Sequence, residues 1–250
     1  MEKELTGKVA IVTGGSSGIG EALCRLYVQH GAKVIVSDIQ DEAGQKLVDE
    51  LNKSGDNAKY VHADVSKPEH CKNTVDEAVK TFGRLDIACN NAGIGDGETA
   101  TGDKDLEAWK KVIDVNLNGV FYGMRYQIPE ILKQKGGAII NMGSILSTVG
   151  FATASAYVAA KHGMLGLTRN AAIEYASQNI RINAIGPAFI RTPLLSGFDD
   201  DTLKMLEQAH PIGRLGESME VAELALWLST EKASFCHGGY YPVDGGYLLR

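Results

Sequence analysis

Residues 8–20 read KVAIVTGGSSGIG, an apolar run that leads into a glycine-rich turn. The run Lys8–Thr13 predicts a buried strand, and the composition after the turn predicts a helix. Glycine has no Cβ, so Gly14, Gly18 and Gly20 allow a tight turn and a close approach of the backbone to a ligand. A helix start also presents free N–H groups and a positive dipole end. We therefore predict that this turn binds the phosphates of a dinucleotide.

The rest of the chain alternates short apolar runs with longer amphipathic segments. Further strands are predicted at Lys33–Ser37, Ala58–His62, Leu85–Cys89, Ala138–Met142, Ile180–Ile185 and Tyr240–Val243. Helices are predicted at Gly18–His30, Glu42–Lys53, Pro68–Phe82, Asp105–Gln127, Ala154–Ala176 and Ser218–Ser229. Strands that alternate with helices and are apolar throughout favour a parallel sheet covered on both faces.

We therefore predict one α/β domain over residues 1–250, with a doubly wound, Rossmann-like parallel sheet of about seven strands and helices on both faces. Ligands of such sheets bind beyond the carboxyl ends of the strands. The segment 187–211 is the least regular part of the chain, which makes it a candidate substrate lid.

The composition excludes several classes of protein. A net charge of −6 argues against a nucleic-acid binder, which needs a basic face. The four cysteines form no C-x-x-C pair, which favours reduced thiols in a reducing compartment. We find no basic, apolar leader and no apolar run near the ~18 residues that span a bilayer, so we expect a cytoplasmic protein without membrane association. The six histidines show no metal-ligand spacing, and we predict no metal site.

Asp38 ends the second predicted strand. A carboxylate at this point can accept hydrogen bonds from the adenosine ribose hydroxyls, and it repels the 2′-phosphate of NADP. The alternative interpretation is that Asp38 only forms the turn into the next helix.

Tyr157 and Lys161 are four residues apart in a predicted helix, so their side chains share one face. A neighbouring ammonium favours the phenolate and lowers the pKa of a tyrosine toward the range useful in catalysis. Ser144 follows a predicted strand, where its hydroxyl can meet a substrate oxygen. Asn116 is a polar residue between apolar neighbours in the long helix, and taken alone it is more typical of a helix-surface or core hydrogen bond.

Together these motifs resemble the short-chain dehydrogenase/reductase family. The glycine spacing is T-G-x-x-x-G-x-G, and Asn90–Gly93 reads N-N-A-G. Asn116, Ser144, Tyr157 and Lys161 then match the family's catalytic residues in order and spacing. The resemblance covers essentially the whole chain.

The resemblance implies hydride transfer between a nicotinamide and a carbonyl carbon, with no metal. Tyr157 would donate a proton to the developing alkoxide, or act as the base in oxidation. Ser144 would stabilise that oxygen, and Lys161 would also hold the nicotinamide ribose. Asn116 would distort its helix and hold a water connected to Lys161.

The resemblance also implies a set of cofactor contacts that run along the ends of the strands. They are Gly14, Ser17, Gly18, Ile19, Gly20, Asp38, Ile39, Asp64, Val65, Asn91, Ala92, Gly93, Tyr157, Lys161, Pro187, Ile190 and Thr192. Relatives that prefer NADP usually place Arg or Lys at the positions of Ser17 or Ile39, which are uncharged here. With Asp38, this predicts NAD(H) as the cofactor.

The predicted substrate pocket is mostly apolar, and it is formed by Ile145, Leu146, Phe151, Ala188, Leu195 and Phe198. Such a pocket favours a hydrophobic secondary alcohol or ketone over a sugar or a charged acid. Ala188 stands where relatives commonly have glycine, which bears on the size of the substrate. Relatives are commonly tetramers, so the resemblance implies a homotetramer.

We predict an NAD(H)-dependent alcohol dehydrogenase or ketoreductase that uses Tyr157 as its acid–base. Two alternatives stay open. An NADP-dependent 3-oxoacyl reductase would be expected to carry a basic residue at position 17 or 39. A non-catalytic dinucleotide-binding sensor would be expected to lose Tyr157 or Lys161, and both are present.

Overall fold

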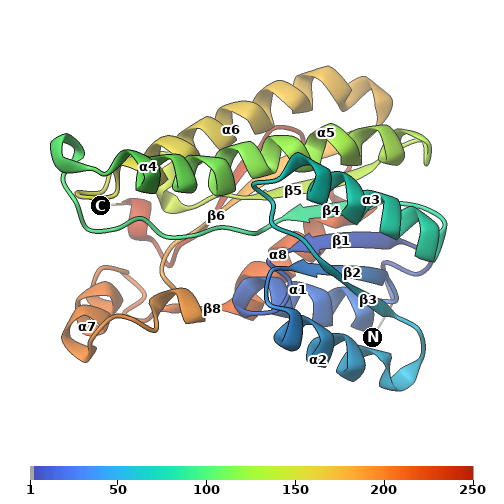
Figure 1. Cartoon of the computed structure of the whole chain (residues 1–250), viewed down its shortest axis with the longest axis horizontal. Coiled ribbons are helices and arrows are strands. Elements are labelled where there is room, and N and C mark those ends of the chain that lie inside the picture. The colour runs from blue at the N-terminus through green and yellow to red at the C-terminus, as the bar shows by residue number, and fades with distance from the viewer. Residues whose placement is uncertain (1–2, 250) are drawn as a thin grey trace.

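The computed structural model of the protein describes residues 3–249. It is built on a seven-stranded sheet in which every pairing is parallel (Figure 1). In spatial order the strands are β3 (Ala58–His62), β2 (Lys33–Asp38), β1 (Val9–Thr13), β4 (Ile87–Asn90), β5 (Gly137–Met142), β6 (Ile180–Pro187) and β9 (Tyr240–Val243). The predicted doubly wound parallel sheet is confirmed.

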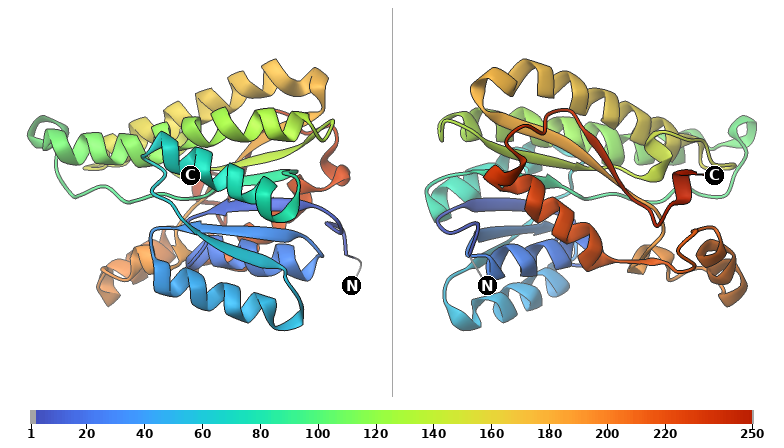
Figure 2. Two further views of the ribbon diagram at one scale, coloured as in Figure 1. Left: turned by 45° about the vertical axis from the view of Figure 1, so that its right-hand side comes forward. Right: turned by 180° about the vertical axis from the view of Figure 1, so that it is seen from behind.

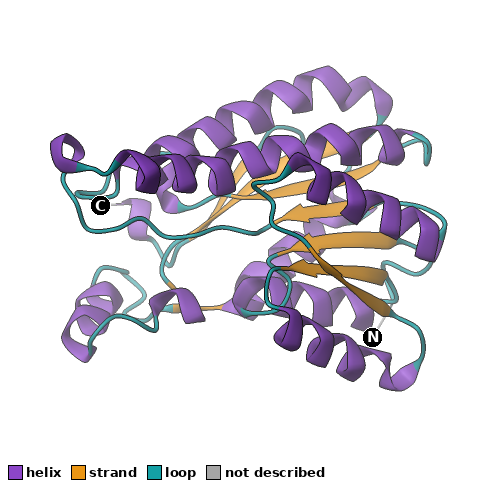
Figure 3. Ribbon diagram, in the orientation of Figure 1, coloured by secondary structure: helices purple, strands orange, loops and turns teal. Residues whose placement is uncertain are grey.

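Helices cover both faces of this sheet, as Figure 3 shows. One face packs against α1 (Gly18–Gln29), α2 (Asp41–Leu51) and α8 (Ser218–Ser229), and the other against α3 (Pro68–Phe82), α5 (Gly119–Leu132) and α6 (Ser155–Tyr175). The rear view in Figure 2 shows α8 beside α1. Successive residues of β1 alternate between the two cores, which explains why the strand is apolar throughout. None of the helices within residues 3–249 combines the length and hydrophobicity needed to cross a membrane.

The strand order reverses between β1 and β4, which are neighbours in the sheet although β2 and β3 separate them in the chain. At such a switch point the connections leave in opposite directions and open a crevice beyond the strand ends. The glycine turn follows β1 and the N-N-A-G segment follows β4, so both motifs lie at this crevice.

The helix predicted over Asp105–Gln127 is interrupted in the structure. It consists of α4 (Leu106–Ile113), a π-helical turn at Asp114–Asn118, and α5, which continues to Leu132. A π-turn widens a helix by one residue and is frequent at functional sites. Asn116 lies in this turn, so the helix is distorted at the residue where the resemblance implied it.

The segment 187–211 is more regular than its sequence indicated. It contains β7 (Ile190–Arg191), which pairs with β8 (Gly216–Glu217), and the helix α7 (Asp200–Gln208). The carboxylate of Asp199 caps α7 by accepting a hydrogen bond from the Thr202 N–H at 2.8 Å. Figure 1 shows α7 at the lower left, set apart from the main helical layers.

A buried amide network ties the carboxyl ends of β4 and β5 to the helices above them. Asn90 and Gln127 exchange two hydrogen bonds, at 2.8 and 3.1 Å. Asn90 also donates to the Asn141 side-chain oxygen at 2.9 Å, and Asn141 donates to the Thr168 hydroxyl at 2.9 Å. All four side chains are buried, so each depends on the others for its hydrogen bonds.

Replacing Asn141 by alanine should therefore destabilise the protein. The Asn141→Ala variant removes one buried hydrogen bond from Asn90 and one from Thr168, which keep their bonds to Gln127 and Met164, at a cost of about 2 kcal/mol. For a domain of this size we expect the thermal midpoint to fall by about 4–8 °C, measured by circular dichroism. Asn170→Ala, which removes an exposed asparagine of α6, is the matched control and should leave the midpoint unchanged. Equal midpoints for the two variants would contradict this account.

Candidate active site

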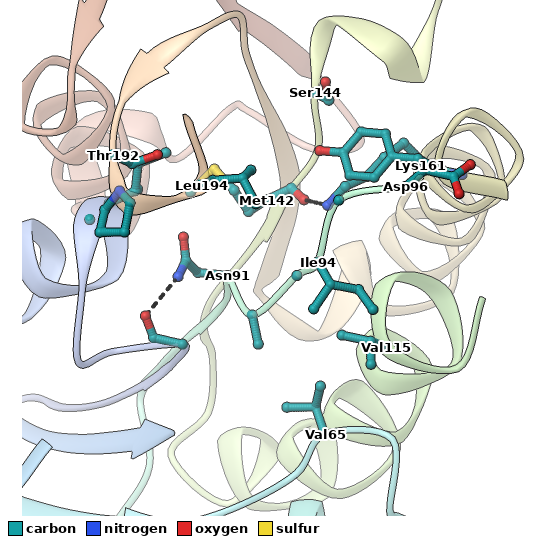
Figure 4. Close-up of a pocket in the computed structure, with 18 of the residues that line it drawn as sticks. Val65, Asn91, Ile94, Asp96, Val115, Met142, Ser144, Lys161, Thr192 and Leu194 are labelled. Atoms are coloured by element: carbon teal, nitrogen blue, oxygen red, sulfur yellow. Dashed lines mark hydrogen bonds between the residues drawn. The ribbon is translucent and has the colours of Figure 1, made fainter. Parts of the chain in front are cut away.

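The carboxyl edge of the sheet borders a pocket of about 870 Å³ (Figure 4). Every predicted cofactor residue except Gly20 lines this pocket, as do Ser144 and all six predicted substrate residues. Asn116 does not line it and is fully buried beneath it. The fold therefore gathers side chains from six strand ends around one space.

The glycine turn is shaped by two residues in the left-handed region, Gly14 with φ 62° and Gly18 with φ 54°. A Cβ on Gly14 would lie 2.9 Å from the Ala92 Cα, so this glycine lets the turn approach the N-N-A-G segment. Gly20 makes the predicted tight turn possible. It lies outside the pocket lining, and a Cβ on it would collide with the Gly14 carbonyl oxygen. Gly20 thus serves the packing of the turn on α1.

Thr13 and Asn91 join the two motifs across the switch point. The Thr13 hydroxyl accepts hydrogen bonds from the backbone N–H groups of Asn91 and Ala92, both at 3.0 Å. The Asn91 amide donates to the carbonyl oxygens of Thr13 at 2.9 Å and Gly14 at 3.2 Å, and Figure 4 shows Asn91 directed at the turn. These bonds hold the ends of β1 and β4 in one fixed arrangement.

The start of α1 has the properties of an anion site. Ser17 occupies the N-cap position but makes no side-chain cap hydrogen bond. The hydroxyl oxygen of Ser16 is buried without a partner. The first N–H groups of the helix are therefore available at the pocket wall, where the helix dipole favours negative charge. The residues present fit the pyrophosphate of a dinucleotide.

Asp38 lies at the end of β2 and is 7% exposed. One carboxylate oxygen accepts from the Ser16 N–H at 3.0 Å, and the other from the N–H groups of Ile39 at 2.7 Å and Gln40 at 3.1 Å. Asp38 therefore forms the turn and also lines the pocket. A carboxylate has about four lone-pair sites, so Asp38 can still accept a hydrogen bond from a ligand hydroxyl.

Asp64 and Val65 lie at the end of the pocket that β3 provides. The Asp64 carboxylate accepts from the Ser66 N–H at 2.9 Å. Burial alone would raise the pKa of Asp64, but the hydrogen bonds from Ser66 outweigh it and hold the pKa below its usual range. Asp64 is therefore an acceptor at neutral pH.

Tyr157 and Lys161 share one face of α6, and the Lys161 ammonium lies 5.4 Å from the centre of the Tyr157 ring. Lys161 donates to the Met142 carbonyl oxygen at 2.8 Å. Burial raises the pKa of Tyr157, and a hydrogen bond with Ser144 opposes that rise. Burial also lowers the pKa of Lys161 to about 8. The structure thus differs from the expectation that the ammonium lowers the phenol pKa, because burial has the larger effect on both groups.

Asn116 is held by the widened turn that it occupies. Its amide nitrogen donates to the carbonyl oxygens of Val112 at 3.1 Å and Ile94 at 3.0 Å, and its oxygen accepts from the Ile94 N–H at 3.2 Å. A Cβ on Gly93 would lie 2.7 Å from the Asn116 oxygen and 3.7 Å from the Lys161 nitrogen. The absence of a side chain at Gly93 therefore leaves room for the Asn116 amide beside this backbone.

Ser144 follows β5 and its backbone is fixed from several sides. The Tyr240 hydroxyl donates to the Ser144 carbonyl oxygen at 2.8 Å. The Ser144 hydroxyl accepts from the Leu146 N–H at 3.1 Å, and the Ser144 N–H donates to the Ser147 hydroxyl at 3.1 Å. The serine hydroxyl is thereby held at the pocket wall, within hydrogen-bonding reach of Tyr157.

Beyond Ser144 the pocket is apolar and partly aromatic. Phe151 and Phe189 meet edge to face with ring centres 6.3 Å apart. The Phe189 ring also packs 5.9 Å from both His210 and Tyr247. His210 follows α7, so this cluster joins the 187–211 segment to the C-terminal end of the described chain. Phe189, which belongs to the segment predicted to be a lid, thus contacts Phe151 of the pocket wall and Tyr247.

Several residues at the site were not predicted from the sequence. Ile94 and Met142 act through backbone groups, which leave no trace in the identity of a side chain. Tyr240 reaches Ser144 from the far end of the chain. Asp96 and Lys104 form an ion pair at 2.7 Å beside α6, and no spacing pattern marks that pair in the sequence. Each depends on contacts that only the folded chain brings about.

Comparisons with known proteins agree with this geometry. Residues 14–248 match the family described as "Enoyl-(Acyl carrier protein) reductase". Over 250 residues the chain is 47% identical to the cyclohexanol dehydrogenase of Acinetobacter sp. (strain SE19), covering 100% of this chain and 98% of that protein. The chain belongs to the short-chain dehydrogenase/reductase family. The resemblance found in the sequence is confirmed, and the chain is an oxidoreductase of that family.

Two further members extend the comparison. The 2,5-dichloro-2,5-cyclohexadiene-1,4-diol dehydrogenase of Sphingobium indicum (strain DSM 16412 / CCM 7286 / MTCC 6364 / B90A) is 40% identical over 248 residues, covering 98% of each protein. A solved structure, of a putative NAD(P) dependent gluconate 5-dehydrogenase from Beutenbergia cavernae with bound NADP at low occupancy, has a TM-score of 0.93 and 32% identity, covering 100% of both chains. The substrates in the names of these relatives differ, although all are called dehydrogenases.

The buried ammonium of Lys161 should make stability depend on pH. Its folded-state pKa of about 8 is below the usual Lys value of 10.5, so the unfolded chain binds more protons between these values and stability rises with pH. Lys161→Met removes the buried charge. Without added nucleotide, its thermal midpoint should exceed that of the unmodified protein at pH 7, and this advantage should shrink by pH 9.5. Lys133→Met, at an exposed lysine, is the control. A Lys161→Met advantage that is absent at pH 7, or constant with pH, would contradict this account.

Proposed function

We propose that this chain is an NAD(H)-dependent dehydrogenase of cyclic secondary alcohols, with Tyr157 as its acid–base. The observation that carries the proposal is the meeting of Tyr157, Ser144 and Lys161 where the dinucleotide-sized pocket becomes apolar. Beyond these three residues the predicted substrate wall consists of apolar side chains, so a substrate oxygen binds at the three polar groups and the hydrocarbon part occupies the apolar wall.

Tyr157 transfers the proton of the substrate hydroxyl. In oxidation the phenolate form accepts it, and in reduction the phenol returns it. The Ser144 hydroxyl hydrogen-bonds the same oxygen and stabilises the charge that develops on it. Lys161 places a positive charge beside the ring, and burial lowers its pKa to about 8. Asn116 lies beneath these residues, where two hydrogen bonds with the Ile94 backbone hold its amide.

The remaining pocket residues fit a nicotinamide dinucleotide, which when bound exchanges hydride with the carbon of the substrate. The glycine turn and the start of α1 hold the pyrophosphate. Asp64 accepts at the adenine end, and Pro187, Ile190 and Thr192 line the opposite end with Lys161. The preference for NAD over NADP rests on Asp38, whose carboxylate would repel a 2′-phosphate, and on the uncharged Ser17 and Ile39.

The substrate class rests on the apolar end of the pocket and on the relatives named for ring alcohols. Ile145 and Leu146 border Ser144, and Phe151, Ala188, Leu195 and Phe198 continue the wall. These side chains offer area for a saturated ring and few partners for further hydroxyl groups. The names of the Acinetobacter and Sphingobium relatives, a cyclohexanol dehydrogenase and a cyclohexadiene-diol dehydrogenase, point to the same class.

We also propose that the enzyme is cytoplasmic and a homotetramer, as the family resemblance implies.

Segment 187–211 is proposed to close over the bound substrate. Leu194 is 60% and Phe198 37% exposed, and both line the pocket. Apolar side chains in that position lose contact with water when a substrate binds beneath them. The aromatic contacts of Phe189 and His210 with Tyr247, which lies outside the segment, give it a fixed point beside the pocket.

Tyr157→Phe should abolish turnover while leaving cofactor binding intact. The substitution removes the transferable proton but keeps the ring that fills the site. We expect kcat for cyclohexanol with NAD⁺ to fall by at least about 10³-fold, and the Kd for NADH, measured by fluorescence titration, to change less than about twofold. Tyr175→Phe, near the other end of α6, is the control and should be fully active. Near-normal rates in Tyr157→Phe would overturn the mechanism.

Asp38→Ala should relax the preference for NADH. Initial rates of cyclohexanone reduction with NADH and NADPH give the ratio of kcat/KM values for the two cofactors. That ratio should favour NADH in the unmodified enzyme and fall at least about tenfold in Asp38→Ala, because the repelling carboxylate is gone. An NADPH preference in the unmodified enzyme would refute the cofactor assignment. An unchanged ratio in the variant would remove Asp38 from it.

A further inference from the structure

The N-terminus of α6, which carries Tyr157 in its first turn, has no cap from its own sequence. Ala154 occupies the N-cap position and has no side-chain acceptor. The hydroxyl of Ser155, the first residue of the helix, is buried and has no hydrogen-bond partner. A helix start normally needs an acceptor for the N–H groups of its second and third residues. Here those residues are Ala156 and Tyr157 itself.

A carboxylate from a distant loop supplies that acceptor. One oxygen of Asp96 accepts from the Ala156 N–H at 2.9 Å and from the Tyr157 N–H at 3.3 Å. Asp96 follows β4 by a few residues and is 60 positions away from Ala156 in the chain. The cap of the helix is therefore tertiary, and it ends on the backbone of the proposed acid–base. In Figure 4, Asp96 lies on the same side of the pocket as Lys161.

Lys104 completes the arrangement. Its ammonium lies 2.7 Å from the second Asp96 oxygen, and the two side chains are only 6% and 2% exposed. Lys104 also donates to the carbonyl oxygens of Gly97 at 2.8 Å and Thr153 at 3.4 Å. All three ammonium hydrogens thus have acceptors, and the pair joins the loop after β4 to the turn before α6. Thr153 has a φ of 66°, which is unusual for a residue with a side chain.

The same loop also holds Asn116, since Ile94 exchanges two hydrogen bonds with its amide. Only Gly95 separates Ile94, which holds Asn116, from Asp96, which accepts from the Tyr157 N–H. Charge-assisted hydrogen bonds to a helix start are among the stronger ones, and the dipole of α6 adds to them. We propose that the buried Asp96–Lys104 pair is the positioning unit for Tyr157, and that it sets the place of the phenol relative to Ser144 and Lys161.

This inference rests on the proposed function, because it assigns Asp96 to the placement of the acid–base. Asp96 and Lys104 act through Tyr157 and are positioning residues. Misplacing a reacting group by about 1 Å costs on the order of 10²-fold in rate. Removal of Asp96 should therefore lower kcat and leave the binding of the cofactor at the other strand ends unchanged.

The test compares three variants at a temperature below all their thermal midpoints, with rates expressed per NADH-binding site. Asp96→Ala should lower kcat for cyclohexanol by about 10- to 100-fold and change the Kd for NADH by less than about twofold. The double variant Asp96→Asn with Lys104→Gln keeps a neutral acceptor for the two N–H groups, and it should recover most of kcat. Asp105→Ala, which removes a cap from α4 at the Ala108 N–H, is the matched control and should keep its kcat.

A separate readout does not depend on the substrate. Amide hydrogen exchange at residues 155–158 should be faster in Asp96→Ala and close to normal in the double variant and in Asp105→Ala. The proposal is overturned if Asp96→Ala keeps kcat within about twofold, or if Asp96→Ala and Asp105→Ala lower kcat equally. Recovery of thermal stability without kcat in the double variant also contradicts it. Absence of turnover in the unmodified enzyme, by contrast, refutes the proposed function, and the exchange experiment still tests the cap.

Discussion

The hydrogen bonds between Thr13 and Asn91 join two strands that the chain connects only through two further strands and three helices. At the switch point β1 and β4 are neighbours, but the segments that follow them leave in opposite directions. Without a link between them, the glycine turn and the N-N-A-G segment would be free to separate. With it, the turn at Gly14 approaches Ala92, and Gly93 approaches Asn116, so closely that neither glycine has room for a side chain. The pocket is thus built outward from one polar contact at the centre of the sheet.

The layers around that contact are apolar, and this makes each buried polar group costly unless it is paired. The Asn90–Asn141 link, the Lys161 bond to Met142 and the Asp96–Lys104 pair all lie between the sheet and α5 or α6, or at the ends of these elements. Each of these contacts gives a buried polar group the hydrogen-bond partner that water would provide at the surface. The same burial raises the pKa of Tyr157 and lowers that of Lys161. A low-dielectric site therefore shifts the pKa of both groups toward their neutral forms.

The two ends of the pocket differ in how they are held. The dinucleotide end is formed by turns directly after strands, whose positions follow from the sheet. The substrate end is formed partly by segment 187–211, where α7 has one buried side chain, Leu206. Few apolar contacts mean a lower free energy of local opening. Specificity for a substrate can thus vary by changes in that segment, while the reaction chemistry stays with the rigid part.

Much of the architecture could be predicted from the sequence, because strand and helix periodicity, the glycine turn and the Tyr157–Lys161 spacing are local properties of the chain. Alternation of apolar strands with helices leaves few arrangements other than a parallel, doubly wound sheet. Local patterns also located the turns that border the pocket. They did not reveal the cap that Asp96 places on α6, and only the resemblance pointed to the distorted helix at Asn116. Those features depend on contacts between residues far apart in the chain. The shifted pKa values of Tyr157 and Lys161 depend on burial. Both the contacts and the burial exist only once the chain has folded.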